Sequence, residues 1–309
     1  MAATRDGYGQ ALLELAENEK VVVLEADLGK STKSLHVRKA YPERTISCGI
    51  GEQNMLLVAA GMASCGYIPF ASTFAIFTER AFEQMRNGVA RPTLAVHLCG
   101  SHGGTHTGTD GSSAQSIEDL AIYRTLPNVT VMHPSDEVST RILTKRLASS
   151  PNPSYMRTAR NKTPVLYDDV PEDSIQIGKG IELKNGNDVA SVACGVLVSE
   201  ALKAADMLAE EGIHATVVDM HTIKPLDTVL IDDIAKRCGC IVTAEDHSII
   251  GGLGGAVAEH LSMTASTPLE RVGVKDRFGE SGQSDEMREL MELSAPHIAN
   301  AARRVIQRK

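Results

Sequence analysis

The most informative segment of the sequence is Thr45-Ile-Ser-Cys-Gly-Ile-Gly-Glu-Gln-Asn-Met55, and an apolar segment follows it as far as Cys65. The pattern predicts a short strand, a turn at Gly49 and Gly51, and then a helix. Glu52 falls in the first turn of that helix, beside glycines that let another molecule approach the backbone. A carboxylate at this position also favours the helix through the macrodipole alone, so position by itself does not make Glu52 functional. The residues at helical spacing on the apolar face are Met55, Leu56, Ala59, Met62 and Ala63.

Aromatic side chains follow this helix. The chain has five Phe, and three of them are Phe70, Phe74 and Phe77. A carboxylate that bonds a ring nitrogen and aromatic groups that stack on the ring face would together hold a heteroaromatic ligand. Ordinary core packing accounts for the same aromatic residues, and the local pattern leaves both interpretations open.

Strands alternate with helices along the whole chain, which predicts α/β architecture with two doubly wound domains. We expect domains at residues 1–162 and 176–309, with a proline-containing linker at 163–175. Ligands of such sheets bind beyond the carboxyl ends of the strands. In the first half we expect strands at 21–24, 67–71, 93–97, 129–132 and 154–157, helices at 4–18, 77–90, 117–124 and 136–149, and a polar loop at 99–116. In the second half we expect strands at 189–193, 214–219 and 240–244, helices at 199–210 and 227–237, and helices towards the end of the chain.

Composition restricts the possible functions. The chain has 309 residues and a net charge of −8, which argues against nucleic-acid binding. No apolar run reaches the ~20 residues of a membrane helix, and the first residues lack the apolar core of a signal peptide. The six Cys form no Cys-x-x-Cys pair, and the ten His do not cluster at metal-ligand spacing. We therefore expect a cytoplasmic protein with reduced cysteines, no membrane contact and no metal site built from this chain alone.

Two motifs together resemble a known family. Gly-x-Gly-Glu-Gln-x-Met at 49–55 and Pro-Phe-x-Ser-Thr-Phe-x-x-Phe at 69–77 resemble the pyrimidine-binding domain of transketolases and other thiamine-diphosphate enzymes. The resemblance implies that Glu52 bonds the aminopyrimidine ring and activates the cofactor. It implies that Phe74 and Phe77 pack against that ring and that Asp27 lies near the thiazolium. Thr243 to Gly254 and Val218 to Asp227 resemble the C-terminal domain of the same enzymes.

The resemblance also implies a set of substrate ligands. Arg5, Ser31, His102 and Arg160 match positions that bind the phosphate of a sugar, and Asp110 matches an aspartate that contacts sugar hydroxyls. Arginine suits this role because it makes paired, charge-assisted bonds to anions. His102 and Asp110 are eight positions apart, as in the family pattern.

A segment that binds the cofactor's diphosphate is missing from this sequence. The family uses a Gly-Asp-Gly…Asn segment and a divalent cation (Mg, Ca or Mn), and Asp110-Gly-Ser-Ser does not match it. The resemblance therefore implies the C-terminal subunit of a split transketolase. We expect an N-terminal partner subunit to supply the diphosphate and metal ligands, in a heterotetramer of two plus two chains.

One position departs from the family pattern. Ala114 stands where transketolases usually have a histidine, and His106 in the same loop is a candidate substitute. The expected reaction is transfer of a two-carbon ketol unit from an anionic ketose to an aldose. Three alternatives stay open: a β subunit of a 2-oxoacid dehydrogenase, an enzyme like deoxyxylulose-phosphate synthase, and a non-catalytic assembly subunit.

Overall fold

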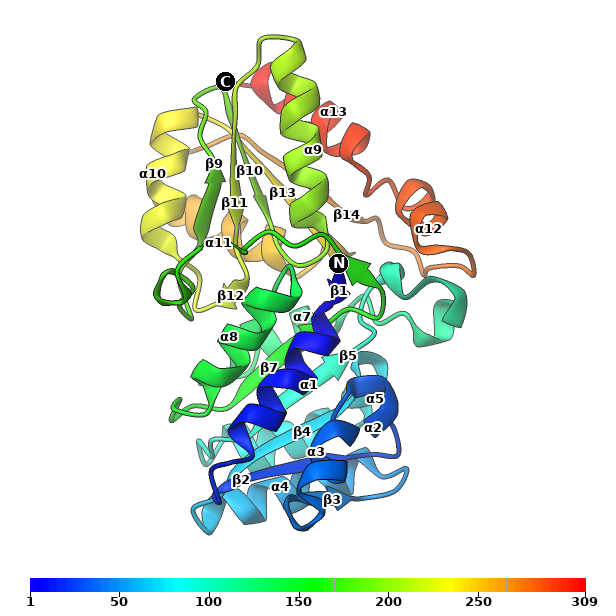
Figure 1. Cartoon of the computed structure of the whole chain (residues 1–309). Coiled ribbons are helices and arrows are strands. Elements are labelled where there is room, and N and C mark those ends of the chain that lie inside the picture. The colour runs from blue at the N-terminus through cyan, green and yellow to red at the C-terminus, as the bar shows by residue number, and fades with distance from the viewer. Residues whose placement is uncertain (169, 265) are drawn as a thin grey trace.

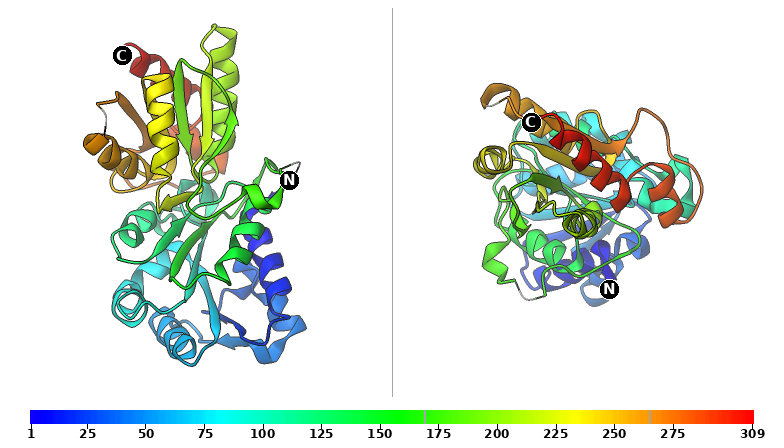
Figure 2. Two further views of the ribbon diagram at one scale, coloured as in Figure 1. Left: turned by 90° about the vertical axis from the view of Figure 1, so that its left-hand side faces the viewer. Right: turned by 90° about the horizontal axis from the view of Figure 1, so that it is seen from above.

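The computed structural model of the chain describes residues 1–309 except Asp169 and Ala265. Two β-sheets lie end to end, one in the lower lobe and one in the upper lobe of Figure 1. Helices cover both faces of each sheet, so both sheets are buried and their central strands are nearly continuous apolar runs. The left view in Figure 2 shows the same two lobes with a narrower waist between them.

The lower sheet has seven strands in the order β12-β6-β7-β5-β4-β2-β3, and all neighbours are parallel except β12 and β6. Its strands are β2 (Val21–Glu25), β3 (Thr45–Ser47), β4 (Ile68–Phe74), β5 (His97–Ser101), β6 (Thr130–Met132), β7 (Ser154–Thr158) and β12 (Thr222–Lys224). Strand β12 comes from the second half of the chain, so this sheet is not built by the first 162 residues alone.

Successive residues of these strands face opposite layers, as the pleat of a strand requires. Val21 and Val23 pack with α1 (Thr4–Leu15) and α8 (Glu137–Leu147), whereas Val22 and Leu24 belong to a core that includes α4 (Glu52–Ser64). The other helices of this lobe are α2 (Gly29–Thr32), α3 (Leu35–Ala40), α5 (Ala75–Arg80), α6 (Phe82–Gln84) and α7 (Asp119–Arg124).

The upper sheet has the order β14-β13-β10-β11-β9, with β9 antiparallel to its neighbour and the rest parallel. Its strands are β9 (Ile181–Lys184), β10 (Val189–Ala193), β11 (Ala215–Asp219), β13 (Ile241–Ser248) and β14 (Leu269–Val274). Helices α9 (Leu197–Glu210) and α13 (Ala295–Ile306) pack on one face, and α10 (Thr228–Cys238) and α11 (Leu253–Thr264) on the other. Helix α12 (Ser284–Leu290) follows the last strand of this sheet in the chain and contacts the segment Thr105–Asp110 of the lower lobe.

A single apolar cluster runs through both lobes. It includes Leu24 and Leu98 of the lower sheet together with Val192 and Val218 of the upper sheet. Because the cluster is continuous, the two lobes share buried apolar surface, which contributes ~25 cal/mol for each Å² removed from water. Among the described residues, no helix is long and apolar enough to cross a bilayer.

The glycine run Gly251 to Gly255 has a structural explanation. The buried carboxylate of Glu245 accepts hydrogen bonds from the backbone nitrogens of Leu253 (2.7 Å) and Gly254 (2.8 Å) at the start of α11. A Cβ atom at Gly252 would lie 2.0 Å from Glu245 Oε2, so glycine is required there. The protein's own carboxylate occupies the helix N-terminus.

Several expected elements differ from the structure. The strand expected at 93–97 was wrong, because pairing with β4 and β7 begins at His97 and continues to Ser101. The helix expected at 77–90 begins at Ala75 and breaks near Ala81. In the expected loop, Thr105–Asp110 and Ser112–Ala114 form two 3₁₀ turns.

Candidate active site

Glu52 is a buried carboxylate at the first residue of α4. Two glycines form the turn before this helix: Gly49, whose φ is +63°, and Gly51, which directly precedes Glu52. Glu52 is 3% exposed, and its Oε2 has no hydrogen-bond partner among the residues that the structure describes, although the guanidinium of Arg80 lies 3.9 Å away. An unpaired buried acceptor costs ~1–3 kcal/mol, so it needs an explanation beyond packing. The free oxygen suits the N–H of a heteroaromatic ring.

Two parallel aromatic rings lie at the carboxyl end of β4. Phe74 ends the strand and Phe77 lies on α5, with ring centroids 5.7 Å apart and planes inclined by 11°. Arg80, on the same helix, carries the guanidinium next to Glu52. Helix α5 thus places an aromatic ring and the ion-pair partner of the carboxylate together, an arrangement suited to a flat ligand.

His102 joins these rings to a group of charged residues. Its imidazole stacks on Phe74 with centroids 3.9 Å apart, and its Nε2 lies 3.4 Å from Arg5 Nη1. Burial, together with the charges of Arg5 and Arg160, lowers the pKa of His102 to about 3, so the ring is neutral at pH 7. A neutral ring accepts the Arg5 N–H at Nε2 and donates its Nδ1 proton to Ser101 Oγ, 2.8 Å away.

Arg5 and Arg160 supply the positive charge of this group. Arg160 Nε lies 3.3 Å from Asp110 Oδ2, and Arg5 Nη1 donates to the carbonyl of Ser31 at 3.0 Å. Burial is the main cause of the lowered pKa of Arg5; Arg160 also lowers it, whereas Asp6 and Asp110 raise it. Arg5 Nε is buried without a hydrogen-bond partner among the described residues. The group therefore keeps a free donor where an anion could bind. Ser31 meets the group through its carbonyl and not through its hydroxyl.

Pairing of two short strands brings these distant residues together. Strand β1 (Ala2–Ala3) pairs antiparallel with β8 (Lys162–Thr163). In addition, Thr4 Oγ1 accepts a hydrogen bond of 2.6 Å from the backbone nitrogen of Ala159. Arg5 and Arg160 are close to these paired segments, which explains why their side chains reach the same place.

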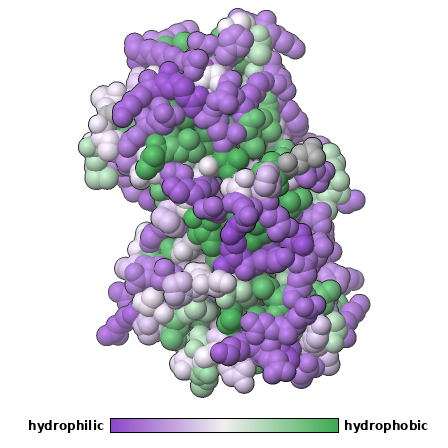
Figure 3. Space-filling view, turned by 60° about the vertical axis from the view of Figure 1, so that its left-hand side comes forward, coloured by the Kyte–Doolittle hydropathy of each residue, from purple (hydrophilic) through white to green (hydrophobic). Residues whose placement is uncertain are grey.

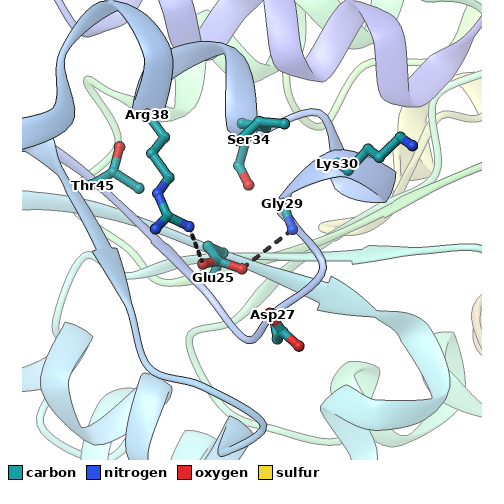
Figure 4. A pocket seen from close by; sticks show the side chains of 8 residues that line it. Glu25, Asp27, Gly29, Lys30, Ser34, Arg38 and Thr45 are labelled. Carbon is teal, nitrogen blue, oxygen red and sulfur yellow. Dashed lines mark hydrogen bonds and ion pairs between the residues drawn. The ribbon is translucent and has the colours of Figure 1, made fainter.

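Asp27 lies apart from the Arg5–Arg160 group. It lines a cavity of about 170 Å³ at the end of β2, together with Glu25, Gly29, Lys30, Ser34, Leu35, Arg38 and Thr45. Figure 4 shows Glu25 between Arg38 and the backbone of Gly29, with the Asp27 side chain pointing away from them. Asp27 has φ of +59°. Across the described residues, no hydrogen bond or ion pair joins Asp27 to the other predicted site residues.

His106 lies against the upper lobe. Among the described residues, both ring nitrogens are buried without hydrogen-bond partners. Burial is the main cause of the lowered pKa of His106; Arg288 lowers it as well, whereas Asp246 and Asp285 raise it. Within the part of the chain that the structure describes, no hydrogen bond or ion pair joins the His106 ring to Arg5, Arg160 or Asp110, and its role as a substitute for the histidine that Ala114 replaces stays a prediction.

Three residues of this region, Arg80, Ser101 and Asp246, were not predicted from the sequence. Arg80 follows Phe77 at helical spacing, which could have indicated that it shares the site. Asp246 contacts residues about 140 positions earlier, and no sequence pattern indicates such a contact. In the part of the chain that the structure describes, no three His, Cys, Asp or Glu side chains are grouped to hold a metal ion.

Comparison with known proteins identifies both halves of the chain. Residues 1–165 match the pyrimidine-binding domain of transketolase, and residues 178–298 match the transketolase C-terminal domain. The chain is 44% identical over 96% of its length to a transketolase C-terminal section of Methanocaldococcus jannaschii, covering 93% of that protein. It is 39% identical over 99% of its length to the 6-deoxy-6-sulfo-D-fructose transketolase subunit SqwH of Clostridium sp. (strain MSTE9), covering 95% of that protein. A solved structure described as a split gene transketolase, inactive beta4 tetramer, superposes with a TM-score of 0.92 at 46% identity, over 99% of both chains.

Proposed function

The chain belongs to the transketolase family, and we propose that it is the C-terminal subunit of a thiamine-diphosphate-dependent transketolase. The proposed reaction moves a two-carbon ketol unit from an anionic ketose to an aldose, and it requires an N-terminal partner subunit. The observation that carries the proposal is the buried Glu52 carboxylate near the Phe74–Phe77 pair. In the described part of the chain, its Oε2 has no hydrogen-bond partner.

Glu52 would form a hydrogen bond with a ring nitrogen of the aminopyrimidine, and it would accept an N–H there when that nitrogen carries a proton. Burial strengthens such a bond because the surrounding dielectric is low, and the Arg80 guanidinium, 3.9 Å from Oε2, adds positive charge beside the carboxylate. Phe74 and Phe77 would pack against the ring and fix its orientation. When bound, thiamine diphosphate supplies the carbon nucleophile that takes up the two-carbon unit.

Arg5 and Arg160 would bind the terminal anion of the ketose. Their guanidinium groups suit phosphate and sulfonate alike, since both anions present several oxygens to paired N–H donors. Asp110, held by Arg160, would accept hydrogen bonds from sugar hydroxyls. His102, being neutral, adds a polar contact and no charge. The SqwH relative is named for a sulfonated ketose, so the sulfonate deserves equal weight in an assay.

The partner would cover the surface around Glu52. Ile50 is 79% exposed and Leu57 is 51% exposed, and both lie within five residues of Glu52 in the chain. Phe77 is 40% exposed and lies on α5, the helix whose Arg80 is next to Glu52. Figure 3 shows further apolar surface in the upper lobe and at the waist. Exposed apolar groups of this kind typically mark contacts with another protein. We expect the N-terminal subunit to bind at the surface around Glu52 and to supply the diphosphate and cation ligands. Two copies of each subunit would then form a two-plus-two assembly.

Reconstitution tests the proposal. The chain is mixed with its N-terminal partner, thiamine diphosphate and Mg²⁺, and ketol transfer is measured with phosphorylated, sulfonated and uncharged ketoses. We expect transfer only with both subunits and preference for an anionic ketose. Glu52→Gln removes the charged acceptor with little change in volume, and it should leave the unfolding temperature unchanged while abolishing transfer.

Two results would contradict the proposal. A Glu52→Gln enzyme that keeps more than about a tenth of the wild-type rate would exclude the proposed role of Glu52, because loss of one essential electrostatic group typically costs ~10²–10³ in rate. Release of carbon dioxide from a 2-oxoacid, without ketol transfer, would instead indicate a 2-oxoacid dehydrogenase β subunit.

A further inference from the structure

We infer that Asp246, in the upper lobe, is a positioning residue that holds the loop between His102 and Asp110 in the shape that binds the substrate anion. The inference rests on the proposed function, because that function gives the loop its ligand. Asp246 lies on β13 and is 2% exposed. It touches neither of the residues proposed to bind substrate on this loop, so its effect would pass through the loop backbone.

The Asp246 carboxylate accepts three hydrogen bonds from the loop. Its Oδ1 accepts from the backbone nitrogen of Thr105 (2.9 Å) and from Thr105 Oγ1 (2.7 Å), and its Oδ2 accepts from the backbone nitrogen of His106 (2.8 Å). These two residues begin the 3₁₀ turn Thr105–Asp110. Bonds from neutral donors to a buried carboxylate are stronger than neutral pairs, so the turn is anchored at its first residues.

Glycine makes this approach possible. Gly104 has φ of +81° and ψ of 173°, a conformation that is essentially restricted to glycine. A Cβ atom at Gly104 would lie 2.4 Å from Asp246 Oδ2 and 2.7 Å from the Asp246 carbonyl oxygen. Gly103 is similarly constrained, since its Cβ would lie 2.5 Å from Arg157 Nε. The backbone before the turn is therefore shaped to fit Asp246 and Arg157.

Arg157, on β7, joins Asp246 to Ser116, a residue that follows the loop in the chain. Its Nη1 donates to the Asp246 carbonyl at 2.6 Å, and its Nη2 donates to the Ser116 carbonyl at 3.3 Å. Ser116 in turn accepts a 2.7 Å bond from the Gly104 backbone nitrogen. Arg157 is fully buried and forms an ion pair with Asp119. Gly104, at the start of the loop, is thus connected through Ser116 and Arg157 to Asp246 on β13.

The anchored segment connects directly to the proposed anion ligands. Thr107 Oγ1 donates to the carbonyl of His102 at 2.6 Å, so the position of the turn determines where the imidazole meets Arg5. Asp110, at the other end of the turn, meets Arg160. Loss of the Asp246 bonds would let the turn move, and with it both contacts to the arginines.

Asp246→Asn tests the inference in the reconstituted enzyme and in the isolated chain. The asparagine oxygen can keep the Thr105 bonds, but its NH₂ group faces the His106 N–H, a donor facing a donor. We expect the KM for the anionic ketose to rise about tenfold, equivalent to ~1.4 kcal/mol, while kcat and the KM for thiamine diphosphate change little. In the isolated chain we expect faster hydrogen exchange of residues 102–110 and weaker binding of inorganic phosphate by calorimetry.

Glu245→Gln is the matched control. Glu245 is the preceding residue of β13 and is equally buried, but it caps α11 and does not touch the loop. Its variant should lose stability without any change in the KM for ketose or in exchange of residues 102–110. Thr105→Val serves if Asp246→Asn fails to fold, because it removes one bond to Oδ1 and keeps the side-chain shape. It should shift the same readouts in the same direction by a smaller factor.

The results for Asp246→Asn and Glu245→Gln either support the proposed role of Asp246 or overturn it. Wild-type KM and wild-type phosphate affinity in Asp246→Asn would overturn the inference, as would an equal rise in KM in Glu245→Gln. If the wild-type pair transferred no ketol unit, the proposed function would fail. Phosphate affinity and loop exchange would then still support the inference if Asp246→Asn lowered the first and accelerated the second. Unchanged values would overturn it.

Discussion

The imidazole of His102 stacks on the ring of Phe74, with centroids 3.9 Å apart and planes inclined by 23°. Through this contact, the aromatic pair near Glu52 and the charged group around Arg5 become one continuous surface. In the proposed enzyme, the cofactor ring and the ketose would therefore bind side by side.

Phe74→Leu should weaken the binding of both the cofactor and the ketose. It keeps an apolar side chain but removes the flat face that meets Phe77 and His102. Aromatic pairs contribute ~0.5–1.5 kcal/mol beyond buried area, so we expect the KM values for cofactor and for ketose each to rise about two- to tenfold. Steady-state kinetics of the reconstituted enzyme measures both. Phe82→Leu is the control, because Phe82 packs against Tyr123 away from this surface. A selective effect on only one ligand would contradict the continuous surface.

Arg5→Lys and Arg160→Lys should discriminate between anionic and uncharged ketoses. Lysine keeps the charge but loses the planar, paired N–H donors. We expect the KM for a phosphorylated or sulfonated ketose to rise by a factor of about ten, because a charge-assisted hydrogen bond is worth ~1.5–3 kcal/mol. The KM for an uncharged ketose should not change. Equal losses for both classes of ketose would show that these arginines maintain the fold and do not read the anion.

Because the partly buried carboxyl group of Glu79 is protonated in the folded protein, the free energy of unfolding should fall as the pH rises. Burial, with the nearby charges of Glu118 and Asp119, raises the pKa of Glu79 to about 8, although the hydrogen bond from Ser116 lowers it. The folded state therefore holds a proton that the unfolded state releases above about pH 4.5, and the slope of unfolding free energy with pH is negative between pH 4.5 and 8. Urea unfolding across this range measures the slope. Glu79→Gln, which is always neutral, should make the profile flatter, and an unchanged profile would contradict the assignment.

Gly104→Ala should destabilise the isolated chain. The position combines φ of +81° with a Cβ clash against Asp246. Backbone strain of this type costs ~1–3 kcal/mol before any steric overlap is counted. Gly61→Ala is a suitable control, since Gly61 lies in the helix α4 with nothing within 4 Å of an added Cβ. It should be neutral or stabilising by up to ~1 kcal/mol. Chemical denaturation compares the two, and equal stability would contradict the constraint at Gly104.

The sequence predicts local features of the site well. Glu52 could be predicted because a glycine turn, a helix start and following aromatics all lie within a short stretch of chain. The family resemblance indicated Arg5, His102, Asp110 and Arg160, and the structure brings these four together. Their roles in binding stay predictions, as do those of Phe74, Phe77, Asp27 and Ser31.

Long-range contacts could not be predicted in this way. The approach of Asp246 to Thr105 depends on how the two lobes pack, and no periodicity in either segment encodes it. Strand β12 was missed for a similar reason, since three residues that join a distant sheet have no pattern of their own. The position of the His106 ring depends on the same packing of the two lobes. The spacing of residues in the sequence therefore could not show whether His106 substitutes for the histidine that Ala114 replaces.

Strand β12 has a practical consequence for anyone who wishes to express the two halves separately. It covers the outer side of β6, which would otherwise present unpaired backbone groups at the edge of the lower sheet. A fragment that stops near residue 165 would lack this cover as well as part of the shared apolar cluster. Such a fragment is expected to aggregate, so biochemical work on the N-terminal half is better done in the intact polypeptide.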